Sequence, residues 1–411
     1  MESLFQRFSK SQSTSHINAR TPSKNPVAIH LVGKEDIDNV GRIWRNIEKQ
    51  CKNVSINCNW NWVKTWIDVY GDQVDYWFFV GMVDGKAKGI IMVTRETHRP
   101  LPLPVKAYHI GTHGEPYSDR VRMVHNTVLV LEKYKKNFFS AFLDRFNELF
   151  QWEELVLDDF NSDGAAIFKE LLSERKYDLT VESQNCRLFD LEILRKNKTS
   201  VMENLGKETR HSIRRSMKAL GDITTEWAET PEQALDILNE LITLYQKHWT
   251  ARDKKGMFAS ERFTRFQKEI ISKTFHDGSV IMFRVKSKQY GTIGCLYLIV
   301  DKGVGYGYQC AFNDFEGVEI TGINRKRLRP GFVVHELCIE ECLKRGINAY
   351  NFSIGEYPYK KELTNADSEI VTIAARNSIK PVLRDNIMNL YLKMDDSKQL
   401  SILLKPIRML L

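Results

Sequence analysis

The sequence predicts a mixed α/β protein made of two similar units, each a mixed β-sheet flanked by helices. The main reason is that one order of apolar patterns occurs twice: two helices, two strands joined by a turn, and then a strand, a helix and a strand. The length of 411 residues also favours two units, because a single core rarely serves so long a chain. A hydrophobic content of 42%, with eight Trp and 21 Phe, is sufficient for two cores.

The first unit is expected to span residues 27–194, after a polar tail at 1–26 whose composition does not favour a core. The dipeptide Asp84-Gly85 is typical of a hairpin turn and separates the first two strands. The predicted elements, in chain order, are helices at 35–49 and 59–70, strands at 76–83, 89–94 and 108–110, a helix at 135–150 and a strand at 154–157.

The second unit is expected to span residues 195–378 and to be followed by a C-terminal helical segment at 379–411. Its predicted elements are helices at 231–249 and 260–275, strands at 279–285, 292–300 and 305–312, a helix at 331–344 and a strand at 349–352. Because this order repeats that of the first unit, we infer a tandem duplication.

The composition constrains the metal chemistry and the compartment. The seven Cys are scattered without Cys-x-x-Cys spacing, which indicates reduced thiols, and Cys338 and Cys342 fit one buried helix face. His109 and His113 have a spacing that could suit a metal, but no third ligand lies nearby, so no metal is predicted. No apolar run is long enough to span a membrane and the start of the chain is polar, so we expect a cytoplasmic protein.

A glycine turn before the predicted helix at 331–344 is the first candidate for a site. Helix N-termini leave backbone N–H groups unpaired and carry partial positive charge, so such a turn can hold a pyrophosphate. Here Pro330 presets the first helical φ, Gly331 allows close approach and Arg329 adds charge. The corresponding helix of the first unit has no glycine turn, so we expect one donor site per chain.

The stretch from this turn to Lys360 resembles a known family. Arg329-Pro330-Gly331, a helix, Arg345-Gly346, a strand, Gly355 and Tyr359-Lys360 follow the order of the closing signature of the CelD/BcsL-type cellulose-biosynthesis acetyltransferases. These belong to the GNAT superfamily and are similar to the Fem peptidyltransferases, which also carry two GNAT-like units. The basic segment at 207–215 resembles the helix before the family's second unit.

The resemblance implies tandem GNAT-like units and a donor that is acetyl-CoA or another acyl-CoA. The donor pyrophosphate would lie on the backbone N–H groups of Gly331, Phe332 and Val333, beside Arg329. Its thioester would lie between the diverging strands near 309–312 and 351–353.

For catalysis, Tyr359 and Lys360 are the candidates that donate to developing negative charge, and Glu356 is the candidate base. Lys360 could equally hold an anionic acceptor, and each of the three could instead be an ordinary packed or solvated side chain. The family often has Asp where this chain has Asn351, which puts a carboxylate role there in doubt. His335, one turn into the helix, is interpreted as structural.

Two further groups are candidates for binding the acceptor. Trp249 and Arg252 could line its cleft, although core packing of Trp249 explains the pattern equally well. Arg210 and Arg214, with Lys207 and Lys218, would share one helix face, which suits an anionic partner or is simply a solvated face.

The expected function is transfer of an acyl group from acyl-CoA to an amine or hydroxyl of a polysaccharide precursor or amino-sugar. One alternative is a Fem-like peptidyltransferase that uses aminoacyl-tRNA, but the sequence has no long helical insertion for tRNA and does not favour a nucleic acid partner. The other alternative is a non-catalytic scaffold of an exopolysaccharide assembly, in which the segment at 379–411 could touch a membrane or the assembly.

Overall fold

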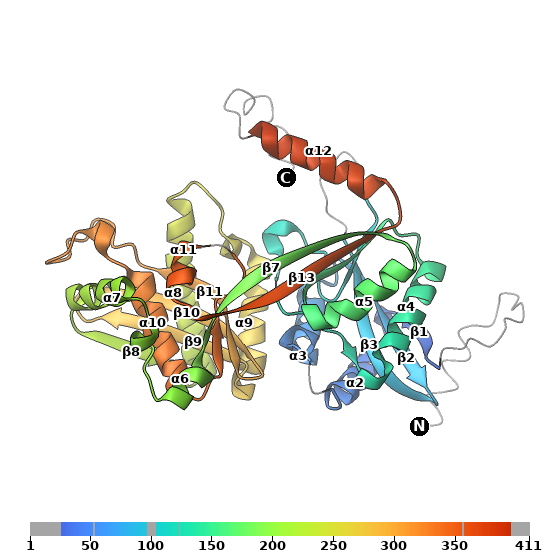
Figure 1. The fold of residues 1–411 in the computed structure, drawn as a ribbon, viewed down its shortest axis with the longest axis horizontal. Helices are drawn as coiled ribbons and strands as arrows, with labels where there is room; N and C mark the ends of the chain where they lie inside the picture. The colour runs from blue at the N-terminus through green and yellow to red at the C-terminus, as the bar shows by residue number, and fades with distance from the viewer. Residues whose placement is uncertain (1–25, 52–53, 97–103, 123, 356, 396–411) are drawn as a thin grey trace, which may run out of the picture.

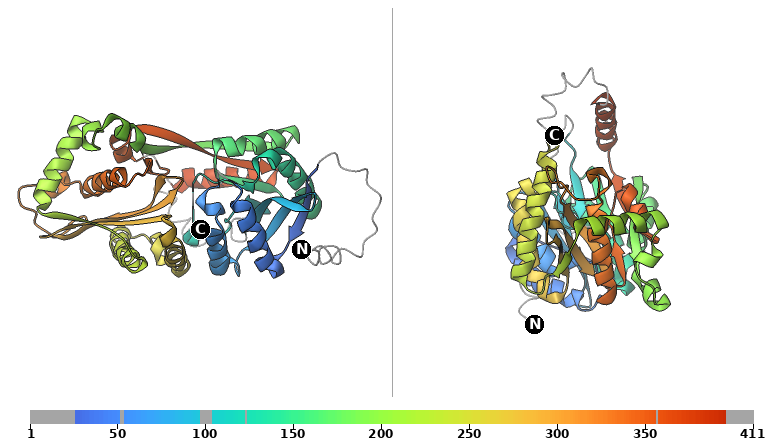
Figure 2. Two further views of the ribbon diagram at one scale, coloured as in Figure 1. Left: turned by 90° about the horizontal axis from the view of Figure 1, so that it is seen from below. Right: turned by 90° about the vertical axis from the view of Figure 1, so that its left-hand side faces the viewer.

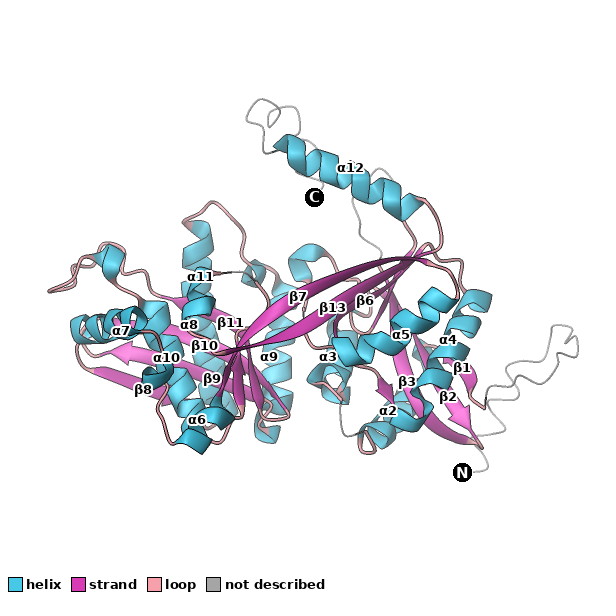
Figure 3. Ribbon diagram, viewed as in Figure 1, coloured by secondary structure: helices cyan, strands magenta, loops and turns pink. Residues whose placement is uncertain are grey.

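The computed structural model describes residues 26–51, 54–96, 104–122, 124–355 and 357–395, with the backbone alone for 388–395. In this part of the chain 13 strands form one continuous sheet, in the order β1-β2-β3-β4-β6-β13-β7-β12-β11-β10-β9-β8, with β5 paired to β3 (Figures 1 and 3). Helices cover both faces of this sheet (Figure 2).

The first half of the chain supplies one end of the sheet. Strands β1 to β4 pair in an antiparallel manner, and β4 then pairs parallel to β6 after the crossover helix α4. The elements are β1 Ala28–Val32, α2 Ile37–Glu48, α3 Trp60–Tyr70, β2 Asp75–Val83, β3 Lys86–Arg95, β4 Ala107–Ile110, β5 Leu129–Val130, α4 Lys135–Leu149, β6 Glu154–Asn161 and α5 Ser162–Glu174.

The second half repeats this plan at the other end. Strands β8 to β11 are antiparallel, and β11 pairs parallel to β12 after the crossover helix α10. The elements are α6 Leu191–Asn197, α7 Lys207–Leu220, β8 Ile223–Trp227, α8 Pro231–Thr250, α9 Glu261–Thr274, β9 Val280–Ser287, β10 Gly291–Asp301, β11 Val304–Phe312, α10 Pro330–Lys344, β12 Ala349–Asn351 and α11 Pro358–Glu362.

Both copies therefore contain a mixed sheet flanked by helices, and the predicted fold class is confirmed. Local signals explain the agreement. Asp84 and Gly85 both have positive φ, 47° and 69°, as the predicted hairpin turn requires. The helix α8 begins with Pro231 after Thr230, whose side chain accepts a hydrogen bond from the Gln233 N–H.

The two long strands that join the halves were not predicted. Strand β7, Asp178–Asp190, follows the first copy but ends against β12 of the second. Strand β13, Ala366–Arg376, follows the second copy but pairs with β6 of the first. The two strands pair with each other along their length and cross between the halves as one ribbon (Figure 1). Since each copy is completed by the other's last strand, the limits 27–194 and 195–378 stay a prediction.

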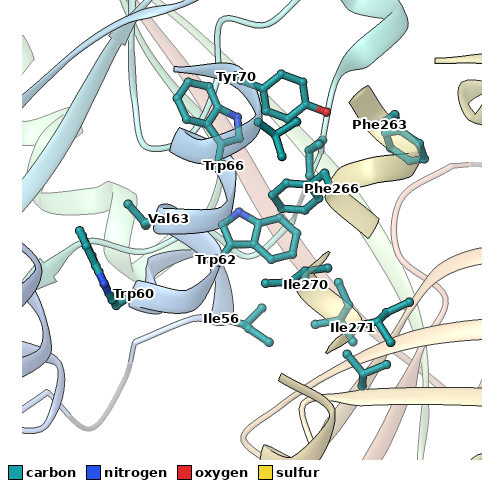
Figure 4. Packing of buried hydrophobic residues seen from close by; sticks show 14 of the residues in the cluster. Ile56, Trp60, Trp62, Val63, Trp66, Tyr70, Phe263, Phe266, Ile270 and Ile271 are labelled. Atoms are coloured by element: carbon teal, nitrogen blue, oxygen red, sulfur yellow. The ribbon is translucent and has the colours of Figure 1, made fainter. Parts of the chain in front are cut away.

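Three large apolar clusters hold the molecule together: one is centred on the first half and includes residues of β13, one lies in the second half, and one lies between the halves. In the cluster between the halves, α3 packs on α9, its counterpart in the second copy. The rings of Trp62 and Phe266 meet edge to face with their centroids 4.9 Å apart (Figure 4). The two copies are therefore fixed to each other by a core as well as by the shared ribbon.

The last described helix, α12 Lys380–Asp395, leaves the sheet after β13 (Figure 1). It is anchored at its start by Arg384, which donates to both carboxylate oxygens of buried Glu154 at 2.8 and 3.0 Å. Among the residues that the structure describes, none of the helices has the length and apolar character to cross a bilayer.

Candidate active site

A cavity of about 820 Å³ lies where β11 and β12 separate, and side chains from both halves of the chain line it. The two strands pair only over Val304–Tyr306 and Ala349–Asn351. A β-bulge on β11, beside Tyr297 and Leu298 of β10, adds an extra residue and bends the strand away. The edge of β11 from Tyr308 onward consequently borders the cavity with no strand paired to it in the described chain.

The turn after β12 is held by side chains of its own. Ser353 has a φ of +56°, a conformation that costs energy for a non-glycine residue. Its N–H donates to Asn351 Oδ1 at 2.7 Å and its hydroxyl donates to the Gly307 carbonyl at 2.9 Å. Asn351, which occupies the position where the resembling family often has Asp, therefore holds this turn.

Lys360 completes this turn. The side chain is only 4% exposed, and its ammonium donates to the carbonyl oxygens of Phe352 at 2.8 Å, Ser353 at 3.2 Å and Ile354. An ammonium has three N–H donors, so these carbonyls use all of them. Although Lys360 lines the cavity, the arrangement is that of a positioning residue, which differs from the predicted role as a direct donor.

The helix start matches the predicted donor turn in part. Arg329 is the N-cap, Pro330 and Gly331 line the cavity, and the Gly331 N–H has no acceptor in the described chain. The Phe332 and Val333 N–H groups instead both donate to the Arg329 carbonyl, at 3.1 and 3.2 Å, and Val333 is fully buried. Of the three predicted pyrophosphate donors, only the Gly331 N–H is without an acceptor in the described chain, and the contacts from Phe332 and Val333 stay predictions.

Tyr359 stands on the short helix α11 beside the start of α10. Its ring contacts that of Phe332, with centroids 6.4 Å apart, and stacks on that of His335 at 5.8 Å. Burial raises the pKa of the Tyr359 hydroxyl, so the phenol keeps its proton at neutral pH. The third predicted catalytic residue, Glu356, lies outside the described residues.

His335 was interpreted as structural, yet it lines the cavity. Its Nδ1 lies 2.9 Å from the Tyr350 hydroxyl, while its Nε2 is buried without a partner in the described chain. Burial, helped by the nearby charge of Lys360, lowers the pKa of the imidazole to about 3. A neutral histidine with one unused nitrogen is a functional candidate, and only the tertiary structure indicates it.

The predicted acceptor residues fall into two groups. Trp249 and Arg252, at the end of α8, both line the cavity. Arg210 and Arg214 lie on α7, and neither is among the lining residues. The Arg210 guanidinium donates to the carbonyls of Glu203 and Leu205 at 3.2 and 3.0 Å, which ties it to its own helix start.

The predicted absence of a metal concerned His109 and His113. Nδ1 of His109 lies 2.7 Å from a carboxylate oxygen of Asp158, and the two imidazole rings stack with centroids 5.9 Å apart. Among the described residues, no group of three His, Cys, Asp or Glu side chains is placed to hold a metal ion.

Two copies of one α/β plan, with a glycine-bearing helix start at the separation of two parallel strands, give the chain a tandem GNAT-like fold. Comparison with family models agrees, since residues 207–361 match the model described as "Acetyltransferase (GNAT) domain". The chain is thus similar to this family over residues 207–361, a stretch that contains both the helix start and Lys360. The narrower resemblance to the CelD/BcsL type stays a prediction.

Two solved structures are similar to this chain at low sequence identity. A "Crystal structure of FemX" is 12% identical with a TM-score of 0.51, and the match covers 80% of this chain and 95% of that one. A "Tandem GNAT protein from the clavulanic acid biosynthesis pathway" is 9% identical with a TM-score of 0.40, over 85% of this chain and 98% of that one. No curated protein matches the sequence.

Proposed function

We propose that the protein transfers an acyl group, such as acetyl, from acyl-CoA to an amine or hydroxyl of an amino-sugar or polysaccharide precursor. The observation that carries this proposal is the free N–H of Gly331 at a helix start on the same cavity as the unpaired edge of β11. The helix start suits the pyrophosphate of the donor. The unpaired edge suits the amide groups of its pantetheine arm, which can bind as an added strand does.

In the proposed reaction, the acceptor nitrogen or oxygen attacks the thioester carbonyl carbon. The new bond to carbon forms, the carbon–sulfur bond breaks, and the acceptor gives up one proton to a base. Glu356 remains the candidate for that base. The Tyr359 hydroxyl gives its proton to the departing thiolate sulfur, for which its protonated state at neutral pH is suitable.

His335 supports the transition state in this proposal as a neutral hydrogen-bond donor. If the Tyr350 hydroxyl donates to Nδ1, the proton of the imidazole resides on Nε2 and can be donated to the carbonyl oxygen as negative charge develops. A pKa of about 3 makes this imidazole a poor base but keeps it neutral, which a donor of this kind needs.

An aminoacyl-tRNA donor is the second candidate, and one observation favours it. The exposed residues Lys207, Arg214 and Lys218 of α7 lie outside the cavity, and the basic segment Arg325–Arg327 lies close by, because Arg215 donates to the Arg327 carbonyl at 3.2 Å. A polyanion longer than CoA could use that surface.

Calorimetric titration with acetyl-CoA tests the donor. We expect binding to the wild type and its loss in Gly331→Trp, because even a Cβ at this position would lie 3.2 Å from the Phe312 ring. Gly164→Trp is the matched control, because Gly164 lies on α5 away from the cavity and no atom lies within 4 Å of a Cβ added there. Absence of acetyl-CoA binding by the wild type, together with binding of aminoacyl-tRNA, would overturn the proposal in favour of the second candidate.

A further inference from the structure

An arginine from the first half of the chain lies on the cavity with its hydrogen-bond donors unused. Arg120 follows the short 3-10 helix Tyr117–Asp119 and lines the cavity beside Tyr117, whose ring centroid is 6.0 Å from its guanidinium carbon. Its Nε is buried without a partner, and the described residues accept no hydrogen bond from its side chain. A partly buried guanidinium in this state is costly unless an acceptor arrives from outside.

Arg122, two residues further along the same loop, has a guanidinium whose hydrogen bonds are satisfied by the protein. Arg122 donates to both carboxylate oxygens of Asp159, at 2.6 and 2.8 Å. The two residues are two positions apart and both line the cavity. The difference is that the guanidinium of Arg122 has a protein carboxylate as its acceptor, whereas that of Arg120 has no acceptor in the described chain.

Two buried or half-buried carboxyls, Asp158 and Glu115, interact with the charge of Arg120 but accept no hydrogen bond from it. Asp158 pairs with His109, and Glu115 accepts the Val121 N–H at 2.7 Å. Neither forms an ion pair with Arg120, although its charge acts to lower the pKa of both carboxyls. Burial nevertheless raises the pKa of Glu115 to about 7, and its Oε2 is buried without a partner in the described chain. These carboxyls therefore stabilise the positive charge of Arg120 without accepting a hydrogen bond from its guanidinium.

The charges around the cavity point to the same kind of ligand. The charged lining residues are Arg120, Arg122, Arg252 and Lys360 against the single carboxylate of Asp314. Arg122 is paired with the carboxylate of Asp159, and the ammonium of Lys360 donates to backbone carbonyls. The Asp314 carboxylate lies 3.7 Å from the ammonium of Lys247. Arg120 and Arg252 remain as cations that no carboxylate of the described chain pairs.

We infer that the acceptor carries an anionic group, a phosphate or a carboxylate, and that Arg120 binds it. This inference rests on the proposed function, because it assigns the substrate class of the same cavity. The donor is expected at the start of α10, which belongs to the second half of the chain, whereas Arg120 belongs to the first. An anion held by Arg120 would place the acceptor from the first half against the donor held by the second.

The test uses three acceptors that share one amine: glucosamine, glucosamine 6-phosphate and muramic acid. Transfer from acetyl-CoA is followed by release of the free CoA thiol. We expect wild-type kcat/KM to favour one anionic acceptor over glucosamine. Arg120→Gln should lower kcat/KM for that acceptor about 10- to 100-fold, mainly through KM, and leave glucosamine nearly unchanged. The acceptor that is preferred distinguishes phosphate from carboxylate.

Two further variants make the result specific. Arg120→Lys keeps the charge but loses the planar fork, so it should recover only part of the preference. Arg45→Gln is the matched control, because Arg45 is exposed and lies over Trp60, away from the cavity. Folding of Arg120→Gln is checked by its unfolding midpoint, which should change little, since the variant loses the contact with the Tyr117 ring but no hydrogen bond or ion pair to the described chain.

Two results would overturn the inference. One is a wild type that prefers no anionic acceptor, whether glucosamine reacts equally well or none of the three reacts. The other is an anionic preference that survives in Arg120→Gln. If the wild type still binds acetyl-CoA in either case, the proposed function stands and only the acceptor class is wrong.

Discussion

Nδ1 of His335 lies 2.9 Å from the hydroxyl oxygen of Tyr350, and this pairing leaves Nε2 as the unused nitrogen of a buried imidazole beside the cavity. The rings of Phe312, Phe352 and Tyr359 surround it at centroid distances of 5.4, 5.0 and 5.8 Å. Such an apolar environment excludes water and strengthens any hydrogen bond that Nε2 makes.

The first prediction concerns this nitrogen. His335→Phe should lower kcat about 10²- to 10³-fold and change KM for acetyl-CoA much less, because a donor used mainly in the transition state is lost. His335→Gln, whose amide can reach a similar position, should recover part of the rate. Steady-state kinetics with acetyl-CoA measures both. Equal kcat in the wild type and His335→Phe would remove His335 from the mechanism.

The first prediction extends to the pH dependence of the free energy of unfolding, because His335 is buried as a neutral imidazole. Its pKa is about 3 in the folded protein and near 6.5 when unfolded, so the unfolded state binds more protons between these values. The stability of the wild type should therefore fall as pH decreases from about 6.5 toward 3, and His335→Gln should lack that part of the decrease. Urea unfolding midpoints at several pH values compare the two proteins.

The second prediction concerns Tyr359. Tyr359→Phe removes only the hydroxyl and keeps the ring stacked on His335, so kcat should fall about 10²-fold while stability changes little. Because the pKa of this phenol is raised, wild-type kcat should not decline on the alkaline side until above pH 10. Tyr134→Phe, outside the cavity, is the control. A full rate in Tyr359→Phe would show that the leaving thiolate needs no proton from this residue.

The third prediction separates positioning from chemistry at Lys360. Lys360→Met should lower the free energy of unfolding by roughly 1–3 kcal/mol, because the buried carbonyls of Phe352, Ser353 and Ile354 lose their donor. Its kcat should fall together with stability. Lys196→Met, on the exposed side of α6, is the control for loss of a lysine. A variant with wild-type stability but no activity would instead support the direct role first predicted.

Sequence patterns predicted the paired units because their signals are local. The hairpin at Asp84 and the helix start at Pro330 depend on the φ preferences of a few adjacent residues, and the structure has both. Strands β7 and β13 were missed for the opposite reason. Most of their side chains are exposed or only half-buried, so their apolar pattern is weak, and their partners lie far away along the chain.

The residues of the candidate site also fall into those that the sequence predicted and those whose role only the structure indicates. The glycine of the helix start, Trp249 and Arg252 were predicted from motif and spacing, and all three line the cavity. The states of Lys360, His335 and Arg120 could not be predicted, since each depends on which donors and acceptors the folded chain brings within reach.

The sequence by itself determined the repeated order of elements, the fold class and the helix start that carries Gly331. Only the tertiary structure decided that the ammonium of Lys360 holds a turn, that His335 keeps an unused nitrogen, and that Arg120 reaches the cavity from the other half. The physical reason is that helices, turns and caps follow from neighbouring residues, whereas burial and hydrogen-bond satisfaction are properties of contacts between distant ones.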